Sequence, residues 1–170
     1  MSLTCQTLPS PVGELTLVAD GPHLVAVLWE NDKPGRVRLG PLLAAPDCPV
    51  LGQVARQLDE YFAGSRQQFA LALAFKGTEF QKKVWQALLT IPFGQTRSYS
   101  DIAVQIGHPQ AVRAVGAANG RNPISIIAPC HRVIGASGQL TGFAGGLAAK
   151  ERLLMLEGAL PGRQSELNFL

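Results

Sequence analysis

The sequence predicts an α+β fold in two parts, a small N-terminal α/β domain over residues 1–76 and a helical C-terminal domain over residues 77–170. Two observations support this division. Short apolar runs typical of strands fall in the first half, and two short helices joined by a tight turn, the outline of a helix-turn-helix, fall in the second. A length of 170 residues is sufficient for two small domains packed together.

The composition bounds the class of protein. Hydrophobic residues make up 46% of the chain and charged residues 16%, which excludes a disordered tail. The net charge of +3 favours an anionic partner only weakly. No apolar stretch approaches the roughly 20 residues of a membrane span, and residues 1–13 lack the basic start and apolar run of a signal peptide. We therefore expect a soluble, cytoplasmic protein without membrane contact.

The cysteines indicate reduced thiols. Cys5, Cys48 and Cys130 are odd in number and widely spaced, no Cys-x-x-Cys pair occurs, and the histidines do not cluster with them. Both a disulfide framework and a structural zinc site need closer or paired spacing. We therefore expect no metal and no other cofactor.

Four segments are expected in the first half. Two apolar runs separated by Asp20-Gly21 predict a β-hairpin. The proline-rich stretch 31–49 predicts a surface loop, and a helical apolar face over Leu51–Phe62 predicts a helix ended by Gly64. Alternation over Phe69–Phe75 predicts a strand. The two runs of the hairpin are Glu14–Ala19 and Leu24–Trp29.

The second half begins after Lys76-Gly77 with a helical pattern. Thr78 and Gln81 have the spacing of a capping box, and Pro92 stops the helix that follows. Next, Ser100–Ile106 and Gln110–Asn119 predict the two short helices of the helix-turn-helix. A last helix is expected at about Ala148–Leu156, closed by Gly158.

The second helix of this pair is almost free of side chains. Its small residues leave Arg113 as the only charge on an otherwise bare surface. Close packing against another helix or strand explains such a surface equally well. A major-groove reader would carry several Asn, Gln or Arg side chains, so the alternative is a shallow contact with the DNA minor groove. The small residues are Ala111, Ala114, Gly116, Ala117, Ala118 and Gly120.

Cys130 and His131 are adjacent at the end of the apolar run Ile124–Ala128. A cysteine that attacks carbon needs a base or cation nearby, because few thiols are ionised at neutral pH. Side chains of adjacent strand residues point apart, so the pair meets only if the chain turns, which Pro129 favours. A buried, inert cysteine is the simpler interpretation of the dipeptide alone.

Glu157 makes a reactive site more credible. It lies in the last turn of the final helix, where the helix dipole disfavours an acid. An acid in that position suggests a cationic or hydrogen-bonding partner. A solvated glutamate at a helix end is the alternative.

Pro129-Cys130-His131-Arg132-Val133, preceded by Asn122-Pro123 and the Arg113-Ala-Val-Gly116 helix, resembles the O6-alkylguanine-DNA alkyltransferase family in its bacterial single-chain form. The resemblance runs from about Phe80 to Gly158. The N-terminal half is similar only in length and in the end of its helix at Tyr61-Phe62-Ala63-Gly64. The family fold implies a ribonuclease-H-like N-terminal domain and a winged-helix-like C-terminal domain.

The resemblance implies a stoichiometric DNA-repair protein that transfers a methyl or larger alkyl group from O6 of guanine to Cys130. His131 would activate the thiol through a bound water, and Glu157 would orient His131. Asn122 would be the hinge between the recognition helix and the active-site strand. Arg113 would enter the duplex to replace the flipped nucleotide.

Further roles follow from the same resemblance. Tyr99 would line the phosphate side and assist flipping and leaving-group protonation, while Val133, Phe143 and Ala144 would close the guanine pocket. The family usually has tyrosine where this chain has Phe143, so a hydroxyl contact is absent. Some members bind zinc in the N-terminal half, but Cys5, Cys48 and His23 are too few and too scattered for it.

Three other functions remain in view. A non-catalytic lesion-binding relative lacks the acceptor cysteine, which this chain has. A cysteine hydrolase built on Cys130, His131 and Glu157 needs an oxyanion hole and leaves the bare helix unexplained. A plain helix-turn-helix regulator leaves the cysteine block unexplained. The expected partner is double-stranded DNA bound by a monomer. The sequence leaves open the preferred alkyl group, activity on O4-alkylthymine and cooperative binding.

Overall fold

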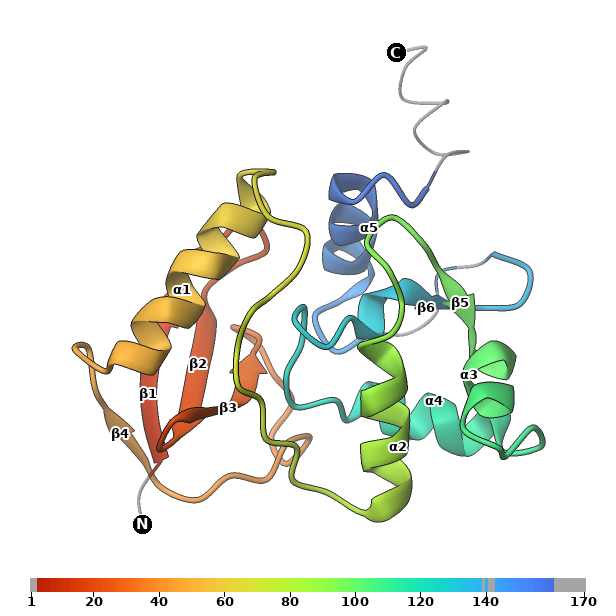
Figure 1. Ribbon diagram of the computed structural model, residues 1–170, viewed down its shortest axis with the longest axis horizontal. Coiled ribbons are helices and arrows are strands. Elements are labelled where there is room, and N and C mark those ends of the chain that lie inside the picture. Colours follow the sequence, from red (N-terminus) through yellow and green to blue (C-terminus); the bar gives the residue numbers. More distant parts are fainter. Residues whose placement is uncertain (1–2, 139, 141–142, 161–170) are drawn as a thin grey trace.

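The computed structural model describes residues 3–138, 140 and 143–160. A sheet domain and a helical domain lie side by side, with residues up to about 75 in one and the remainder in the other (Figure 1). The predicted order, a small sheet domain followed by a helical domain, is confirmed. The elements are β1 (Leu3–Leu8), β2 (Leu15–Asp20), β3 (His23–Leu28), β4 (Leu42–Ala44), α1 (Pro49–Phe62), α2 (Glu79–Leu88), β5 (Arg97–Ser98), α3 (Tyr99–Gln105), α4 (Val112–Gly120), the 3-10 helix η1 (Cys130–Arg132), β6 (Val133–Ile134) and α5 (Leu147–Leu156).

The N-terminal sheet has the strand order β3-β2-β1-β4. The predicted hairpin is formed by β2 and β3, which pair antiparallel. Its turn consists of Gly21 and Pro22, and Gly21 has a φ of 57°. A positive φ at the first central residue is what a type II′ hairpin turn requires, which explains the glycine.

Three segments differ from the prediction. β1 was not expected, because its sequence LTCQTL has no clean alternation, yet it forms a central strand between β2 and β4. β4 lies inside the stretch 31–49 that we expected to be a loop. The predicted strand at Phe69–Phe75 is wrong apart from one bridge between Leu73 and Leu24. Tertiary pairing decided these segments, and local pattern does not reveal it.

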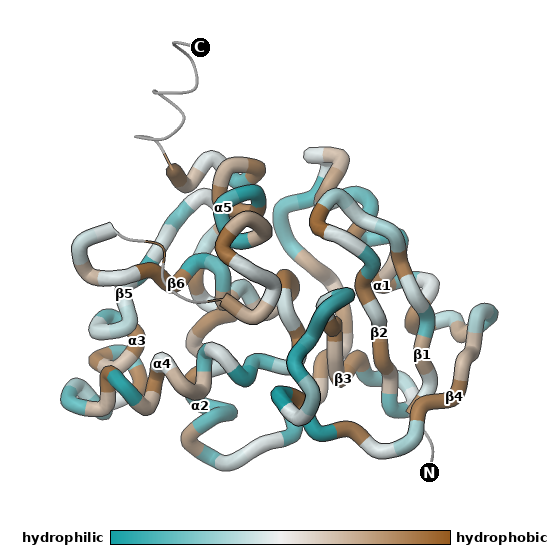
Figure 2. The backbone as a smooth tube through the Cα atoms, turned by 180° about the vertical axis from the view of Figure 1, so that it is seen from behind, coloured by the Kyte–Doolittle hydropathy of each residue, from teal (hydrophilic) through white to brown (hydrophobic). Residues whose placement is uncertain are grey.

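The main hydrophobic core is shared by both domains. α1 covers one face of the sheet with Leu51, Val54, Leu58 and Tyr61, all buried. The same core includes C-terminal residues, namely the apolar run Ile124–Ala128, except its serine, and Leu153. β2 and β3 consist mostly of hydrophobic residues, whereas the loop after β3 is strongly hydrophilic (Figure 2). The two domains therefore form one packed unit.

The two domains are hydrogen-bonded to each other along the edge of β3. The amide of Val27 donates to the carbonyl of Pro123 at 2.9 Å across the domains, and the amide of Leu24 donates to the carbonyl of Ala72 within the sheet domain at the same distance. The segment that leads from α4 to the cysteine therefore lies as an extra extended piece beside β3. This pairing fixes the reactive loop against a rigid sheet.

The helical domain is built around α2. The capping box predicted from Thr78 and Gln81 is present, with both reciprocal hydrogen bonds formed. Trp85 of α2 is buried and donates its indole N–H to the carbonyl of Ala118 in α4 at 2.8 Å. α3 and α4 follow, and α4 begins two residues later than expected. The short strands β5 and β6 pair in parallel, which the sequence did not indicate.

Candidate active site

The chain turns at Cys130, as expected from the proline before it. Pro129 precedes a single turn of 3-10 helix over Cys130–Arg132, so successive side chains point in different directions around it. Just before it, Ile126 has a φ of 73°. A β-branched residue in the left-handed region is strained, by roughly 1–3 kcal/mol, and persists only where its surroundings impose it. Here the surroundings are the shared core, in which Ile126 is buried.

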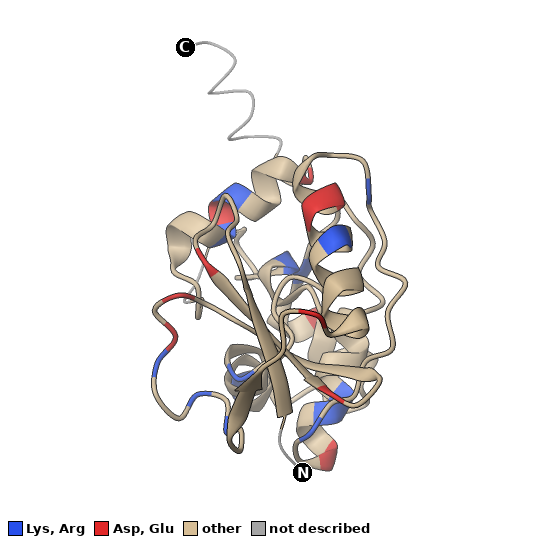
Figure 3. Ribbon diagram, turned by 90° about the vertical axis from the view of Figure 1, so that its left-hand side faces the viewer, with Lys and Arg blue, Asp and Glu red and all other residues tan. Residues whose placement is uncertain are grey.

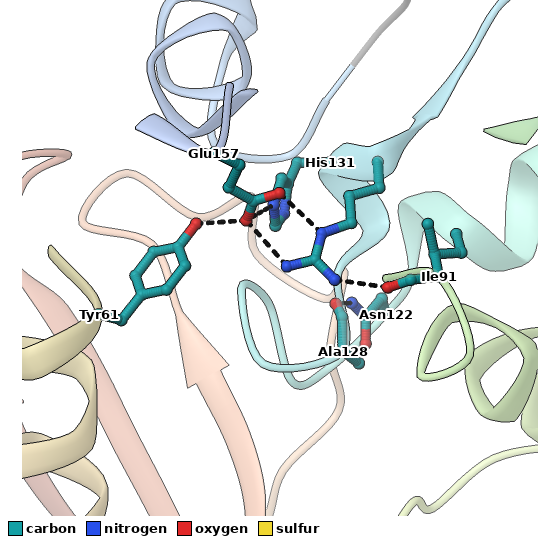
Figure 4. Close-up of polar contacts among 7 residues, drawn as sticks. Tyr61, Ile91, Asn122, Ala128, His131 and Glu157 are labelled. Carbon is teal, nitrogen blue, oxygen red and sulfur yellow. Dashed lines mark hydrogen bonds and ion pairs between the residues drawn. The ribbon is translucent and has the colours of Figure 1, made fainter. Parts of the chain in front are cut away.

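Glu157 is the centre of a buried polar cluster (Figure 4). It caps the C-terminal end of α5, and its side chain has no exposed surface. Its Oε2 lies 2.8 Å from Nε2 of His131 and accepts a hydrogen bond from the Tyr61 hydroxyl at 2.5 Å. Arg132 donates to both carboxylate oxygens, from Nε at 2.7 Å and from Nη2 at 3.0 Å. The solvated-glutamate interpretation is therefore wrong.

Burial and charge act in opposite directions on Glu157. Burial alone would raise the pKa of its carboxyl, but hydrogen bonds and charges from His131 and Arg132 lower it to about 2. Burial lowers the pKa of His131, and Glu157 only partly offsets this. The result at neutral pH is an ionised carboxylate beside a neutral imidazole, which is the state a general base requires.

One ring nitrogen of His131 is hydrogen-bonded to Glu157, and the other can accept a proton. Nε2 contacts Glu157, whereas Nδ1 is buried without a protein hydrogen-bond partner among the described residues. Because the carboxylate fixes a proton on Nε2, Nδ1 is left as the acceptor. The ring can therefore take a proton through Nδ1.

Cys130 is a free thiol with 3% of its surface exposed. Burial raises its pKa, while a hydrogen bond from Asn122 and the charges of Arg36 and Lys150 act to lower it. A thiol in this setting stays protonated and unreactive unless its neighbours help to remove the proton.

Lys150 is a buried cation close to this thiol. It has no exposed surface, and its Nζ donates to the carbonyl of Val133 at 2.6 Å. Its Nζ also lies 5.8 Å from the centre of the Phe143 ring. Burial lowers the pKa of Lys150 to about 8, and the charge of Cys130 acts in the opposite direction. An ammonium group held in this way favours a thiolate next to it.

Two buried asparagines hold the segment that carries Cys130. Asn122 donates from Nδ2 to the Ala128 carbonyl at 2.8 Å and accepts from the Ile124 amide at 3.1 Å. Asn119, in α4, donates to the carbonyl of Cys130 at 3.4 Å. The first asparagine therefore closes the loop on itself, and the second ties it to α4.

Part of the small-residue set of α4 faces outward. Ala114 and Ala117 are exposed, as is Arg113, whereas Val115 and Ala118 face the core. A methyl group added at Gly116 would meet only the Tyr99 ring, at 3.9 Å, an ordinary contact distance. Ala118 packs in the core, but packing within the described chain does not require small side chains at the exposed Ala114 and Ala117. The close-packing interpretation of the bare surface is therefore wrong for this face.

The remaining predicted residues lie around the same loop. Tyr99 begins α3, and Ala111 is the N-cap of α4. Val133 is buried directly after η1, and Phe143 packs edge-on against Trp29 with ring centres 5.3 Å apart. Ala144 is half-buried beside it. Residues 139, 141 and 142, in the glycine-rich stretch we expected to lead to α5, lie outside the described residues.

Three residues near Glu157 or Cys130 were assigned no role from the sequence. Arg132 was noted only as part of the cysteine block, although it is buried and has Glu157 as its ion-pair partner. The available signal in the sequence was an arginine directly after the Cys130-His131 dipeptide. Tyr61 and Lys150 lie 96 and 7 residues from Glu157 in sequence, and nothing in the pattern joins them to it.

No metal site or membrane helix was found in the part of the chain that the structure describes. No group of three or more His, Cys, Asp or Glu side chains there is arranged to hold a metal ion. Within the same residues, no helix is both long and apolar enough to cross a bilayer.

Family models account for most of the chain. The model described as 6-O-methylguanine DNA methyltransferase, DNA binding domain, matches residues 79–159. The model of the ribonuclease-like domain of the same family matches residues 3–75. The division between the two matches falls where the helical pattern begins.

Individual relatives agree with this assignment. The chain is 52% identical over 153 residues to a methylated-DNA–protein-cysteine methyltransferase of Mycobacterium leprae, covering 90% of this chain and 91% of the relative. A relative of the same name in Methanosarcina acetivorans is 50% identical, with coverage of 88% and 95%.

Solved structures are similar over the same extent. OGT of Mycobacterium tuberculosis, solved in complex with DNA, matches with a TM-score of 0.85 at 48% sequence identity. The match covers 92% of this chain and 93% of the OGT chain. A Pyrococcus kodakaraensis O6-methylguanine-DNA methyltransferase shares the fold at 18% identity, with a TM-score of 0.53 and coverage of 92% and 99%. The chain belongs to the 6-O-methylguanine DNA methyltransferase family.

Proposed function

We propose that this protein repairs DNA by transferring an alkyl group from O6 of guanine to its own Cys130. The observation that carries the proposal is the buried His131–Glu157 pair, 2.8 Å apart, directly after a buried free cysteine. The relatives that are half identical over most of the chain bear the name of this activity. A methyl group is the alkyl group that their names specify.

The reaction begins with loss of the Cys130 proton. We assign its acceptance to Nδ1 of His131, through a water, because Nε2 is committed to Glu157. Glu157 stabilises the imidazolium that results, and Lys150 stabilises the thiolate. Arg132 and Tyr61 keep Glu157 ionised and oriented, so they are positioning residues.

The thiolate then attacks the alkyl carbon. A sulfur–carbon bond forms as the carbon–O6 bond breaks, and the electron pair of that bond stays on the guanine. The guanine, which stays attached to the DNA, gains one proton and becomes a neutral base. We assign this donation to Tyr99, and the proton that His131 took from Cys130 restores the Tyr99 hydroxyl through solvent. The thioether on Cys130 is stable, and no described side chain is placed to reverse it, so each molecule reacts once.

The base must leave the helix before Cys130 can reach it. An alkyl group inside stacked DNA is inaccessible, and extrusion costs a few kcal/mol. We propose that α3 and α4 act as a helix-turn-helix that lays its bare face in the minor groove. Ala111, Ala114, Gly116 and Ala117 allow close approach, and Arg113 fills the space left by the flipped nucleotide.

The loop around Cys130 forms the rest of the site in this proposal. Asn122 is the hinge between α4 and the reactive turn, since its amide bridges Ile124 and Ala128. Val133, Phe143 and Ala144 close the guanine pocket. The finer features of the fold belong to the same proposal, namely a ribonuclease-H-like sheet domain at residues 1–76 and a winged-helix-like domain at residues 77–170. We also propose a monomer and a cytoplasmic location, which the three free thiols support.

The alternatives are less well supported. A non-catalytic lesion binder has no use for Cys130 or for a base beside it. A cysteine hydrolase needs donors aimed at an oxyanion, and it does not explain the exposed bare face of α4. Neither alternative explains both the cysteine with its neighbouring base and the exposed face of α4.

The test is transfer of a label from DNA to protein. Duplex DNA carrying O6-methylguanine with a labelled methyl group is incubated with the wild-type protein and with Cys130→Ser. We expect label on the wild type only, with duplex binding near normal in the variant. Repaired DNA with no label on the protein would indicate hydrolysis, and binding without repair would indicate a lesion-binding protein.

A further inference from the structure

We propose that the cleft between the loop after β3 and the C-terminal end of α4 binds a phosphate of the DNA backbone, so that the N-terminal domain takes part in holding the duplex. The cleft has a volume of about 370 Å3. Residues 36–39 line one side, and Arg121 and Pro123 line the other. The inference rests on the proposed function for its ligand and assigns a contact beyond α3 and α4.

The cleft carries uncompensated positive charge. Four cations line it, of which Arg36 is paired with Asp32 and Lys76 with Asp20. Arg38 and Arg121 are exposed, and over the residues described neither has a carboxylate within ion-pair distance. Two arginines without acidic partners across one cleft favour an anion between them, and guanidinium groups bind phosphate well.

Arg36 fixes the geometry of this cleft. Its Nη1 donates to the carbonyls of Gly120 and Asn122 at 3.2 and 2.9 Å, and its Nε pairs with Asp32 at 2.6 Å. These bonds hold the loop of the N-terminal domain against the last turn of α4. They also occupy carbonyls whose negative partial charge would repel a phosphate at a helix C-terminus. The side view shows this loop with its Lys and Arg spread along it (Figure 3).

The position of the cleft suits a duplex lying on α4. Arg113 lies in α4 and Arg121 is the C-cap residue of that helix, eight positions later, or about 12 Å away at 1.5 Å per residue. That distance corresponds to between three and four steps of 3.4 Å along one DNA strand. The exposed Ala114 and Ala117 lie between them. A duplex in contact with Arg113 therefore passes the cleft within a few base pairs of the flipped nucleotide.

The size of the cleft also fits this ligand. At about 370 Å3 the cleft has many times the space that one water molecule needs. A phosphodiester group with bridging waters fits such a volume, and water-mediated contacts are common where proteins bind DNA. The cleft leads outward to exposed arginines, so it suits a backbone that continues past it.

The experiment compares two variants of equal charge. Arg38→Gln removes the proposed contact, and Arg56→Gln removes another exposed arginine, in α1. The dissociation constant for undamaged duplex DNA is measured between 50 and 200 mM salt. The logarithm of the association constant falls linearly with the logarithm of the salt concentration. One lost phosphate contact makes this slope shallower by about 0.9 and weakens binding roughly eightfold at 0.1 M salt. We expect this for Arg38→Gln and wild-type behaviour for Arg56→Gln.

Two further variants complete the test. Arg38→Lys retains the charge and is expected to keep the wild-type slope, while Arg121→Gln is expected to lose as much as Arg38→Gln. Equal slopes for Arg38→Gln and Arg56→Gln would overturn the inference, as would a loss confined to Arg121→Gln. Thermal unfolding midpoints show that each variant folds. Label transfer by the wild type is measured on the same preparation, so failure of the repair activity is recognised separately.

Discussion

At the scale of single residues, Glu157 determines the properties of the site. A carboxylate at the C-terminal end of a helix is disfavoured by the helix dipole, and the sequence indicated a partner for that reason. The structure supplies three partners, His131, Arg132 and Tyr61, and all three bonds are buried. The sequence identified the anomaly because it is local. It could not identify Tyr61, since only the packing of α1 against the helical domain brings the hydroxyl to the carboxylate.

Replacing Glu157 is expected to shift the pH dependence of alkyl transfer. In Glu157→Gln the imidazolium loses its counter-charge, so His131 accepts the thiol proton less readily and a higher pH is needed for the same thiolate population. Each unit by which the apparent pKa of Cys130 rises slows transfer about tenfold at pH values below it. The pH–rate profile of transfer from duplex DNA measures this. A slower reaction with an unshifted profile would assign Glu157 a purely structural role.

The same carboxylate makes the fold sensitive to acid. Its folded-state pKa of about 2 is below the ordinary 4.5, so its contribution to stability is present above pH 4.5 and lost as the pH falls towards 2. A shift of this size corresponds to on the order of 3 kcal/mol. Denaturant unfolding at a series of pH values should show wild type and Glu157→Gln converging over this range. A stability difference that stays constant would contradict the assignment.

At the scale of elements, the helices were predicted best and the sheet edges least well. The small residues of α4 could be interpreted from the sequence because an amphipathic helix shows its own two faces. The structure leaves Arg113, Ala114 and Ala117 exposed, as a ligand-facing surface requires. By contrast, β1 forms a strand because it pairs with β2 and β4, and β4 forms one because it pairs with β1. The local sequence of a strand does not show which other strand it pairs with, so these two strands could not be predicted.

Arg113 is expected to matter for DNA and not for the chemistry. Arg113→Ala should slow repair of O6-methylguanine in duplex DNA by on the order of tenfold or more, because the hole left by the flipped nucleotide is no longer filled. Reaction with free O6-benzylguanine needs no flipping and should be nearly unchanged. The ratio of the two rates in one purified variant is the measurement. Equal losses on both substrates would mean that Arg113 supports the pocket or the fold.

At the scale of the whole molecule, the two domains are coupled through polar contacts. Tyr61 reaches Glu157, Trp29 donates to Ser125 at 3.1 Å, and Arg36 binds the end of α4. All three contacts cross from the sheet domain to the reactive loop or its supports. The sequence predicted two domains but gave no sign of this coupling, because each contact joins residues more than 80 positions apart.

Tyr61→Phe tests this coupling. The variant keeps the ring that packs in the shared core and removes only the hydroxyl, so a hydrogen bond to a charged acceptor is lost. Such bonds contribute roughly 1.5–3 kcal/mol, and we expect that loss in the free energy of unfolding. Tyr99 is the other tyrosine of the chain, but it is assigned to the reaction, so Phe62→Leu, beside Tyr61 and outside the cluster, is the control for packing. Unchanged stability in Tyr61→Phe would mean that the bond across the domains is energetically neutral.

The central claim is that Cys130 itself accepts the alkyl group, once in each molecule. The most direct measurement is mass spectrometry of the protein after reaction with excess duplex DNA carrying O6-methylguanine, followed by peptide mapping. The account predicts one added methyl group per chain, on the peptide that contains Cys130, and no further repair when fresh lesion is added. A methyl group on Cys5 or Cys48, or continued repair by an unmodified protein, would contradict it.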